Sequence, residues 1–169
     1  QTYGITNSTF VSNTSQTSGG GIVVTAQNTV LAIINSTFAA NRGSSGGSIL
    51  VNSGSVTLKN TVVANSPGVG NCSGSITDGG NNLQYGGTVA SSCGATIATA
   101  DPKLGLPGAH GGGTDTMALM VGSAAIDAGN PSTCAATDQR GVARPLGLVC
   151  DIGAYEGRLG PSYLPRAAR

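Results

Sequence analysis

The chain has 169 residues, of which 28 are glycine, none is tryptophan and only 9% carry a charge. An ordinary globular domain is about 25% charged, so this composition favours a surface that is buried in an assembly or faces sugars outside the cell. The net charge of +1 argues against nucleic acid as a partner, because nucleic-acid-binding proteins carry a face rich in lysine and arginine.

The first third of the chain contains a repeated sequence motif. Ile5–Asn13 returns as Ile33–Asn41, and a more divergent copy follows at Leu58–Asn65. Asn7 and Asn35, which occupy the same place in the first two copies, are 28 residues apart. A period of about 20 to 50 residues is typical of solenoids and related arrays, in which each unit buries its apolar face by stacking on the next.

Short runs of β-branched residues with the length of strands accompany these copies. Glycine clusters and asparagines separate the runs, and no window of ten residues shows the 3.6-residue period of a helix. The expected strands are Gly21–Ala26, Thr29–Ile34, Ser48–Val51 and Ser55–Lys59, with one or two more at Gly74–Thr77 and Gly87–Ala90. Because the strands recur in one order, they should pair in parallel, which predicts an all-β parallel β-helix over residues 1–100.

Equivalent side chains of successive coils should stack directly in such a fold. The expected columns are Ile5 with Ile33, Asn7 with Asn35, and Phe10 with Phe38. Asparagine amides can hydrogen bond to the coils above and below, and asparagine also tolerates a left-handed turn conformation. Simple turn formation without an amide ladder is the alternative interpretation of the asparagine column.

Four cysteines bracket two glycine-rich loops. Four cysteines allow three connectivities, and we expect the sequence-local pairs Cys72–Cys93 and Cys134–Cys150, each worth about 3 kcal/mol in the chain-entropy description. Four free buried thiols are the alternative. Disulfides would place the protein in an oxidising, extracellular compartment. A zinc site is not expected, because no C-x-x-C pair occurs and the only histidine, His110, looks like a loop residue.

All but three of the charged residues lie from Asp101 onward, and this part of the chain resembles the choice-of-anchor Q domain. The matching blocks are Asp101–Gly105, Met117–Leu119, Gly122–Gly129, Asp138–Pro145 and Cys150–Glu156. Such domains close right-handed parallel β-helix proteins that bacteria secrete, so the resemblance implies that fold and a secreted or cell-surface location, but no reaction. The chain departs from the family pattern around His110, and it lacks the anchor signal that usually follows the domain.

A cluster of charges of mixed sign lies near the end of the matching region. Its members are Asp138, Arg140, Arg144, Asp151 and Glu156. We expect residues 101–157 to form a capping region in which these charges pair and disulfide-linked loops seal an open end of the solenoid. A tail follows at residues 158–169. The carboxylates, with Asp127, could supply oxygen ligands to calcium, but their spacing matches no calcium loop, and we expect neither a metal nor a cofactor.

The sequence indicates a secreted or cell-surface structural or adhesive protein without enzymatic activity. Enzymes that cleave polysaccharides need paired carboxylates across a sugar subsite, and the coils contain no Asp or Glu before Asp78. A polysaccharide-binding or polysaccharide-degrading module is the alternative function. No stretch of about 18 apolar residues occurs, so no membrane-spanning helix is expected.

We expect the N-terminal end of the solenoid to be covered by another protein surface. The sequence begins directly in repeat sequence at Gln1, which we regard as a plausible mature terminus, and supplies about three coils with one cap, whereas a solenoid generally needs a cap at each end. The first coil also lacks the lysine, proline or inward charge that keeps strand edges from pairing. Either a preceding domain of a longer chain or another copy of this chain could cover the end, and we favour another copy, which predicts a homo-oligomer or filament formed by axial stacking.

Overall fold

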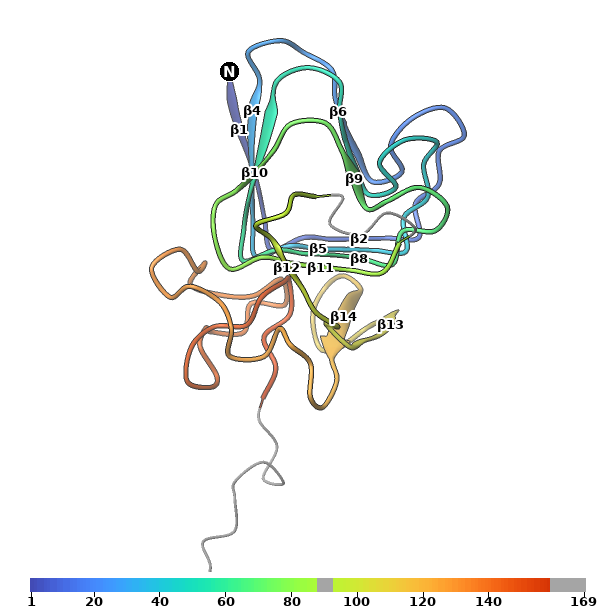
Figure 1. Ribbon diagram of the computed structural model, residues 1–169. Helices are drawn as coiled ribbons and strands as arrows, with labels where there is room; N and C mark the ends of the chain where they lie inside the picture. Colours follow the sequence, from blue (N-terminus) through green and yellow to red (C-terminus); the bar gives the residue numbers. More distant parts are fainter. Residues whose placement is uncertain (88–92, 159–169) are drawn as a thin grey trace, which may run out of the picture.

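The β-branched runs form strands that wind around one axis in the computed structural model, which describes residues 1–87 and 93–158 (Figure 1). The result is a right-handed parallel β-helix of about three turns, and the described residues contain no helix. Coil 1 contains the strands within residues 2–24, coil 2 those within residues 30–51, coil 3 those within residues 55–73, and coil 4 begins at residue 76. The all-β solenoid expected from the repeats is therefore confirmed.

Three parallel sheets form the walls of the solenoid. The first sheet contains β1 (Thr2–Thr6), β4 (Val30–Ile34), β7 (Ser55–Lys59) and β10 (Ile76–Asp78). The second sheet contains β2 (Thr9–Val11), β5 (Thr37–Ala39), β8 (Val62–Ala64), β11 (Leu83–Tyr85) and β12 (Ala98–Thr99). The third sheet contains β3 (Ile22–Val24), β6 (Ile49–Val51) and β9 (Cys72–Ser73).

The register stacks equivalent side chains as the repeat predicts. Ile5 pairs with Ile33, and Phe10 pairs with Phe38. The two phenylalanine rings are stacked in parallel, with centroids 4.6 Å apart. Phe38 is fully buried, whereas Phe10 is only partly buried because it belongs to the first coil. The buried residues of the interior are Val24, Leu31, Ile33, Phe38, Ile49, Val51, Val56, Leu58, Val63, Cys72, Cys93 and Ile97.

An asparagine turn joins the first sheet to the second sheet in every coil. Asn7, Asn35, Asn60 and Asn81 have φ angles of 50°, 45°, 47° and 52°. Residues other than glycine rarely adopt this left-handed conformation, and asparagine is among those that tolerate it best. The turn therefore requires the residue type that recurs in the sequence, and it directs each side chain away from the interior.

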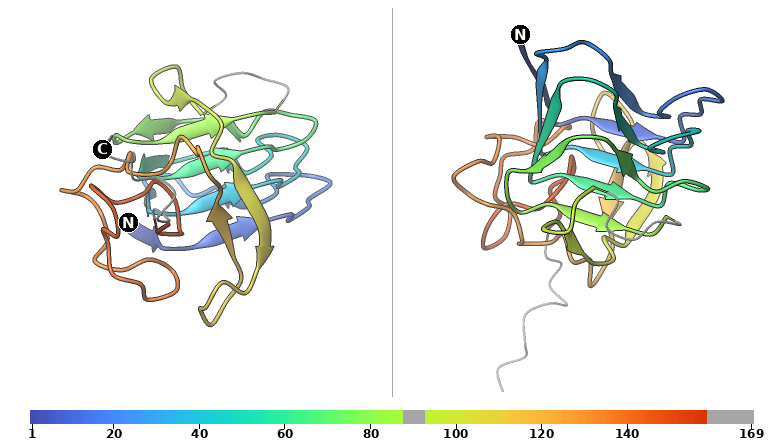
Figure 2. Two further views of the ribbon diagram at one scale, coloured as in Figure 1. Left: turned by 90° about the horizontal axis from the view of Figure 1, so that it is seen from below. Right: turned by 45° about the horizontal axis from the view of Figure 1, so that its top comes forward.

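Residues 101–157 form a loop-rich region that covers the outer face of the second sheet (Figures 1 and 2). It contains one antiparallel hairpin, β13 (Leu104–Gly108) with β14 (Thr116–Leu119), and the disulfide Cys134–Cys150. Val62, Ala64 and Leu83 face outward from the second sheet and pack with Ala125 and Ile152 in a second apolar cluster. The middle strands β5 and β8 of the second sheet are therefore buried on both faces.

The C-terminal region lies along the flank of the solenoid instead of sealing an end. The asparagine side chains, expected to bond from coil to coil, bind this region in all four coils. The bonds are Asn7 Nδ2 to Thr137 O (2.7 Å), Ala135 N to Asn35 Oδ1 (2.9 Å), Asn130 N to Asn60 Oδ1 (2.8 Å) and Asn81 Nδ2 to Ala128 O (2.9 Å). The expectation of an end cap is corrected in this respect, because the outward-pointing amides offer partners along the flank.

A different segment closes the C-terminal end of the solenoid. The disulfide Cys72–Cys93 links β9 of the third sheet to this segment. Cys93 and Ile97 of the segment are buried against the core of the solenoid. Gln84, which is also buried, donates from Nε2 to Gly94 O (2.7 Å) and Ile97 O (2.9 Å), and its Oε1 accepts from Cys93 N (3.1 Å).

Two expectations fall partly outside the described residues. Of the strand expected at Gly87–Ala90, only Gly87 belongs to the described residues. The structure places β11 (Leu83–Tyr85) just before this segment. Of the tail expected at residues 158–169, only Arg158 belongs to the described residues. Within the described residues the coils end at β12 and the flanking region follows.

Candidate functional site

The charged residues near the C-terminus form two buried ion pairs. Arg140 Nη2 lies 2.6 Å from Asp138 Oδ2, and Arg144 Nη1 lies 2.7 Å from Glu156 Oε2. Arg140 also donates to Glu156 O (2.6 Å), and Arg144 donates to Gly153 O (2.7 Å). These side chains therefore bind backbone as well as each other, so they hold the loops of the flanking region together.

The carboxylates of this cluster differ in their pKa. Burial raises the pKa of Asp138, but hydrogen bonds from Glu156 N–H and from Arg140 outweigh burial and hold this pKa below its ordinary value. Burial raises the pKa of Asp151 to about 6, although backbone N–H groups of Asp127 and Gly157 donate to it. Burial lowers the pKa of Arg144, and the charge of Glu156 opposes that shift.

The carboxylates of this cluster accept hydrogen bonds from backbone groups of the flanking region. Glu156 accepts from Leu146 N–H (2.9 Å), Asp151 N–H (2.9 Å) and Arg144, so its oxygens have partners within the fold. The described residues contain no group of three or more His, Cys, Asp or Glu side chains that could hold a metal ion. The calcium ligands considered from the sequence therefore do not converge on one site.

His110 belongs to the same structural region. Its ring lies 5.8 Å from the ring of Tyr155 in an edge-on contact, and its Nδ1 is 3.3 Å from Thr116 Oγ1. The guanidinium carbon of Arg140 lies 3.5 Å from the centre of the Tyr155 ring, a cation–π contact. His110 is thus packed against the charge cluster, which its place in a glycine-rich sequence did not reveal.

The open N-terminal end, formed by β1, β2 and β3, is an unpaired strand edge among the residues that the structure describes. Its strands pair with coil 2 on one side only. Val30 N donates to Gln1 O (2.9 Å) and Asn7 N donates to Ile34 O (3.2 Å). Since alternate residues of a parallel strand bond to the same neighbour, the even positions of β1, Thr2, Gly4 and Thr6, direct their N–H and C=O groups away from coil 2.

The other two strands of the open N-terminal end follow the same rule. Thr37 N donates to Ser8 O (2.9 Å) and Ser12 N donates to Ala39 O (3.1 Å), so Thr9 and Val11 of β2 direct their backbone polar groups outward. Asn52 N donates to Val24 O (2.9 Å), so the backbone N–H and C=O groups of Val23 in β3 point away from coil 2. All three walls of coil 1 therefore present strand-pairing groups in one direction along the axis.

Apolar side chains are also accessible at the open N-terminal end. Ile5, Phe10 and Ile22 are only partly buried, and Tyr3 is 51% exposed. A groove of about 280 Å³ opens at the corner between the first and third sheets, lined by Tyr3, Ile22, Val23, Val24, Thr25, Ala26, Thr29 and Leu31. Residues 1–41 contain no charged side chain, so no charge blocks an approaching strand.

Both disulfides have the sequence-local pairing, Cys72–Cys93 and Cys134–Cys150. Disulfides form and persist in oxidising surroundings, so the pairing indicates an oxidising, extracellular environment. Among the described residues, no helix has the length and apolar character needed to cross a membrane.

Comparisons with protein-family models, with curated proteins and with solved structures find no match for this chain. The resemblance to the choice-of-anchor Q domain therefore stays a prediction from its five sequence blocks. The structure explains why one of these blocks, Cys150–Glu156, contains a glycine at position 153. Gly153 has a φ of 106°, and a Cβ there would lie 2.8 Å from Thr37 Oγ1, so glycine allows the flanking region to approach the second sheet closely.

Proposed function

We propose that this protein is a non-enzymatic structural or adhesive β-helix protein, secreted or held at a cell surface, that assembles through its open N-terminal end. The unpaired edge of coil 1 carries this proposal. The six outward positions derived above lie on all three walls of the solenoid, so a partner that supplies matching strands gains hydrogen bonds around the whole perimeter. An uncharged strand edge of this kind is a template for pairing with another chain.

A second copy of the same chain is the partner that this end fits. A partner must present strands at the spacing of the three walls and apolar side chains opposite Phe10 and Ile22, and another copy's open N-terminal end offers both. Gln84 and Cys93–Ile97 cover the interior at the opposite end. We therefore favour a closed pair of N-terminal ends, related by a two-fold axis, over the head-to-tail filament expected from the sequence.

Sedimentation velocity across a range of protein concentrations tests this assembly. The 16.4 kDa chain should sediment with twice its mass as the concentration rises. Gly4→Pro removes an outward N–H and no bond to coil 2, and a Cβ at Gly4 meets nothing within 4 Å, so the variant should fold but remain monomeric. Gly4→Ala is the matched control and should still associate.

A second variant tests the same strand edge in case Gly4→Pro does not fold. Thr6→Lys places a charge on the exposed edge of β1, in the way that natural strand edges avoid pairing, and it should also give a monomer. Circular dichroism checks that each variant keeps the β-sheet signal. A wild-type chain that remains a monomer at high concentration, or variants that associate as strongly as wild type, would overturn the proposal.

A further inference from the structure

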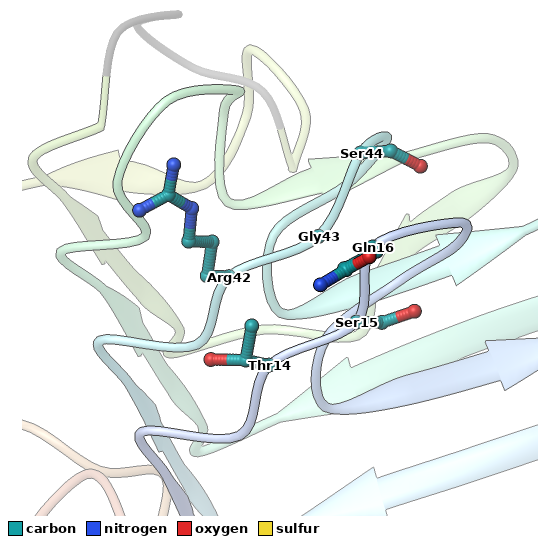
Figure 3. Close-up of a pocket in the computed structure, with 6 residues that line it drawn as sticks. All are labelled: Thr14, Ser15, Gln16, Arg42, Gly43 and Ser44. Carbon is teal, nitrogen blue, oxygen red and sulfur yellow. The ribbon is translucent and has the colours of Figure 1, made fainter.

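Two stacked loops form a polar groove at the corner between the second and third sheets (Figure 3). The loop of coil 1 supplies Thr14, Ser15 and Gln16, and the loop of coil 2 supplies Arg42, Gly43 and Ser44. The groove has a volume of about 460 Å³. Figure 3 shows the Arg42 side chain extending from the loop of coil 2, the Gln16 amide nitrogen of the neighbouring loop directed towards the Arg42 side, and the Ser44 hydroxyl pointing the other way.

Backbone hydrogen bonds hold the two loops in a fixed position. Ser15 N donates to Arg42 O (2.8 Å), Arg42 N donates to Asn13 O (2.8 Å) and Ser44 N donates to Ser18 O (2.9 Å). A Cβ at Gly43 would lie 2.4 Å from Ser18 O, so glycine is needed for this close approach. The groove is therefore formed before any ligand arrives, which lowers the entropy cost of binding.

The side chains that line the groove have unused hydrogen-bonding capacity. Within the part of the chain that the structure describes, Arg42, Gln16 and Ser44 have no side-chain hydrogen bond or ion pair. Arg42 is the first charged residue of the sequence, and no Asp or Glu precedes Asp78. A guanidinium binds a carboxylate through two parallel N–H donors, and the neighbouring amide and hydroxyl groups can bind uncharged hydroxyl groups of the same ligand.

We propose that this groove binds an acidic saccharide, with Arg42 on a sugar carboxylate and Gln16 on a neighbouring hydroxyl. One cation among neutral polar groups matches one sugar carboxylate surrounded by hydroxyl groups. A nucleic acid would need several cations and gains from stacking on aromatic rings, and no aromatic residue lines the groove. This inference is independent of assembly through the open N-terminal end.

A second groove, one coil further along the axis, indicates that the ligand is a polymer. It has a volume of about 280 Å³, includes Gly46, Val69 and Ser73, and shares Ser44 with the first groove. Neighbouring strands are about 4.8 Å apart, which is close to the length of one sugar unit in an extended chain. A polysaccharide running parallel to the axis would therefore place successive sugars over successive coils.

Isothermal titration calorimetry with a short oligouronate and its methyl ester tests this site. The ester keeps the sugar and removes the charge, so the acid should bind at least tenfold more tightly, and added salt should weaken its binding. Arg42→Gln should weaken binding of the acid at least tenfold. Lys59→Gln removes a cation from β7 in the first sheet and should leave binding unchanged. Thermal unfolding of Arg42→Gln should match wild type, because the Arg42 side chain has no partner.

Two further titrations distinguish binding of an oligomer from binding of a single sugar or of a simple anion. The monomeric uronic acid should bind more weakly than the oligomer, because it reaches only one groove. Inorganic phosphate should not displace the oligomer at equal concentration. The proposal is overturned by no oligouronate binding, by equal binding of acid and ester, by Arg42→Gln binding within twofold of wild type, by monomer binding as tight as oligomer binding, or by phosphate competing equally.

Discussion

Replacement of Phe38 by alanine tests the stacking of coils on which the fold depends. Phe38 is fully buried, lies parallel to Phe10 with ring centroids 4.6 Å apart, and is paired with Val63 in coil 3. Removal of a buried phenylalanine side chain typically costs about 3 to 5 kcal/mol of unfolding free energy. For a chain of this size that loss should lower the Tm by roughly 6 to 20 °C.

Urea denaturation followed by far-ultraviolet circular dichroism measures this loss, since the chain has no tryptophan for fluorescence. Phe10→Ala is the matched control. Phe10 is only partly buried, so the monomer should lose about half as much free energy, roughly 2 kcal/mol. If a partner covers the open N-terminal end, the cost of Phe10→Ala should rise with protein concentration. A loss below about 1 kcal/mol for Phe38→Ala would refute the buried column.

Two further predictions concern the flanking region. Because the pKa of Asp151 is raised to about 6, the folded state holds this proton more strongly than the unfolded state, and stability should fall by at most about 3 kcal/mol as the pH rises from about 4 to about 6. Asp151→Asn should flatten that slope in urea titrations at several pH values, and an unchanged slope would contradict the assignment. Asn60→Gly keeps the left-handed turn but removes the bonds to Asn130, so chemical denaturation should show a loss of about 1 to 3 kcal/mol, and no loss would show that these bonds add no stability.

Several strands, the asparagine turns and the disulfides could be predicted because each has a local cause. The short strands of the second sheet at Thr9–Val11, Thr37–Ala39 and Val62–Ala64 are not among the expected strands. β-branched runs such as Thr29–Ile34 favour extended backbone, and the structure places β4 there at Val30–Ile34. The recurring asparagines supply the one left-handed residue that each turn needs. The pairing of Cys72 with Cys93 follows from the short loop between them, since a nearby partner loses less entropy on closure.

The position of the C-terminal region could not be predicted in the same way, because it depends on contacts between residues far apart in the sequence. The signal was present in the second sheet. Val62, Val63 and Ala64 form an apolar run without alternation, and such runs are typical of strands buried on both faces. The structure buries all three residues, with Val63 in the interior cluster and Val62 and Ala64 against the flank.

The closure of the C-terminal end by Gln84 also lay beyond the sequence patterns. Gln84 continues the column of Phe38 and Val63, so a polar side chain points into an apolar interior. An unpaired amide there would lose free energy, but the carbonyls of Gly94 and Ile97 and the N–H of Cys93 satisfy it. A buried glutamine at the last inward position thus marks where stacking by side chains ends and closure by backbone begins.

The solenoid and the flanking region depend on each other for burial of their apolar surfaces. Without residues 101–157, the outward side chains of Val62, Ala64 and Leu83 would face water, and the asparagine turns would lose their partners in all four coils. Without the coils, Ala125 and Ile152 would lose the surface on which they pack. The boundary near residue 100 therefore separates two kinds of structure within one folding unit, and the asparagine that each turn requires also attaches the flanking region.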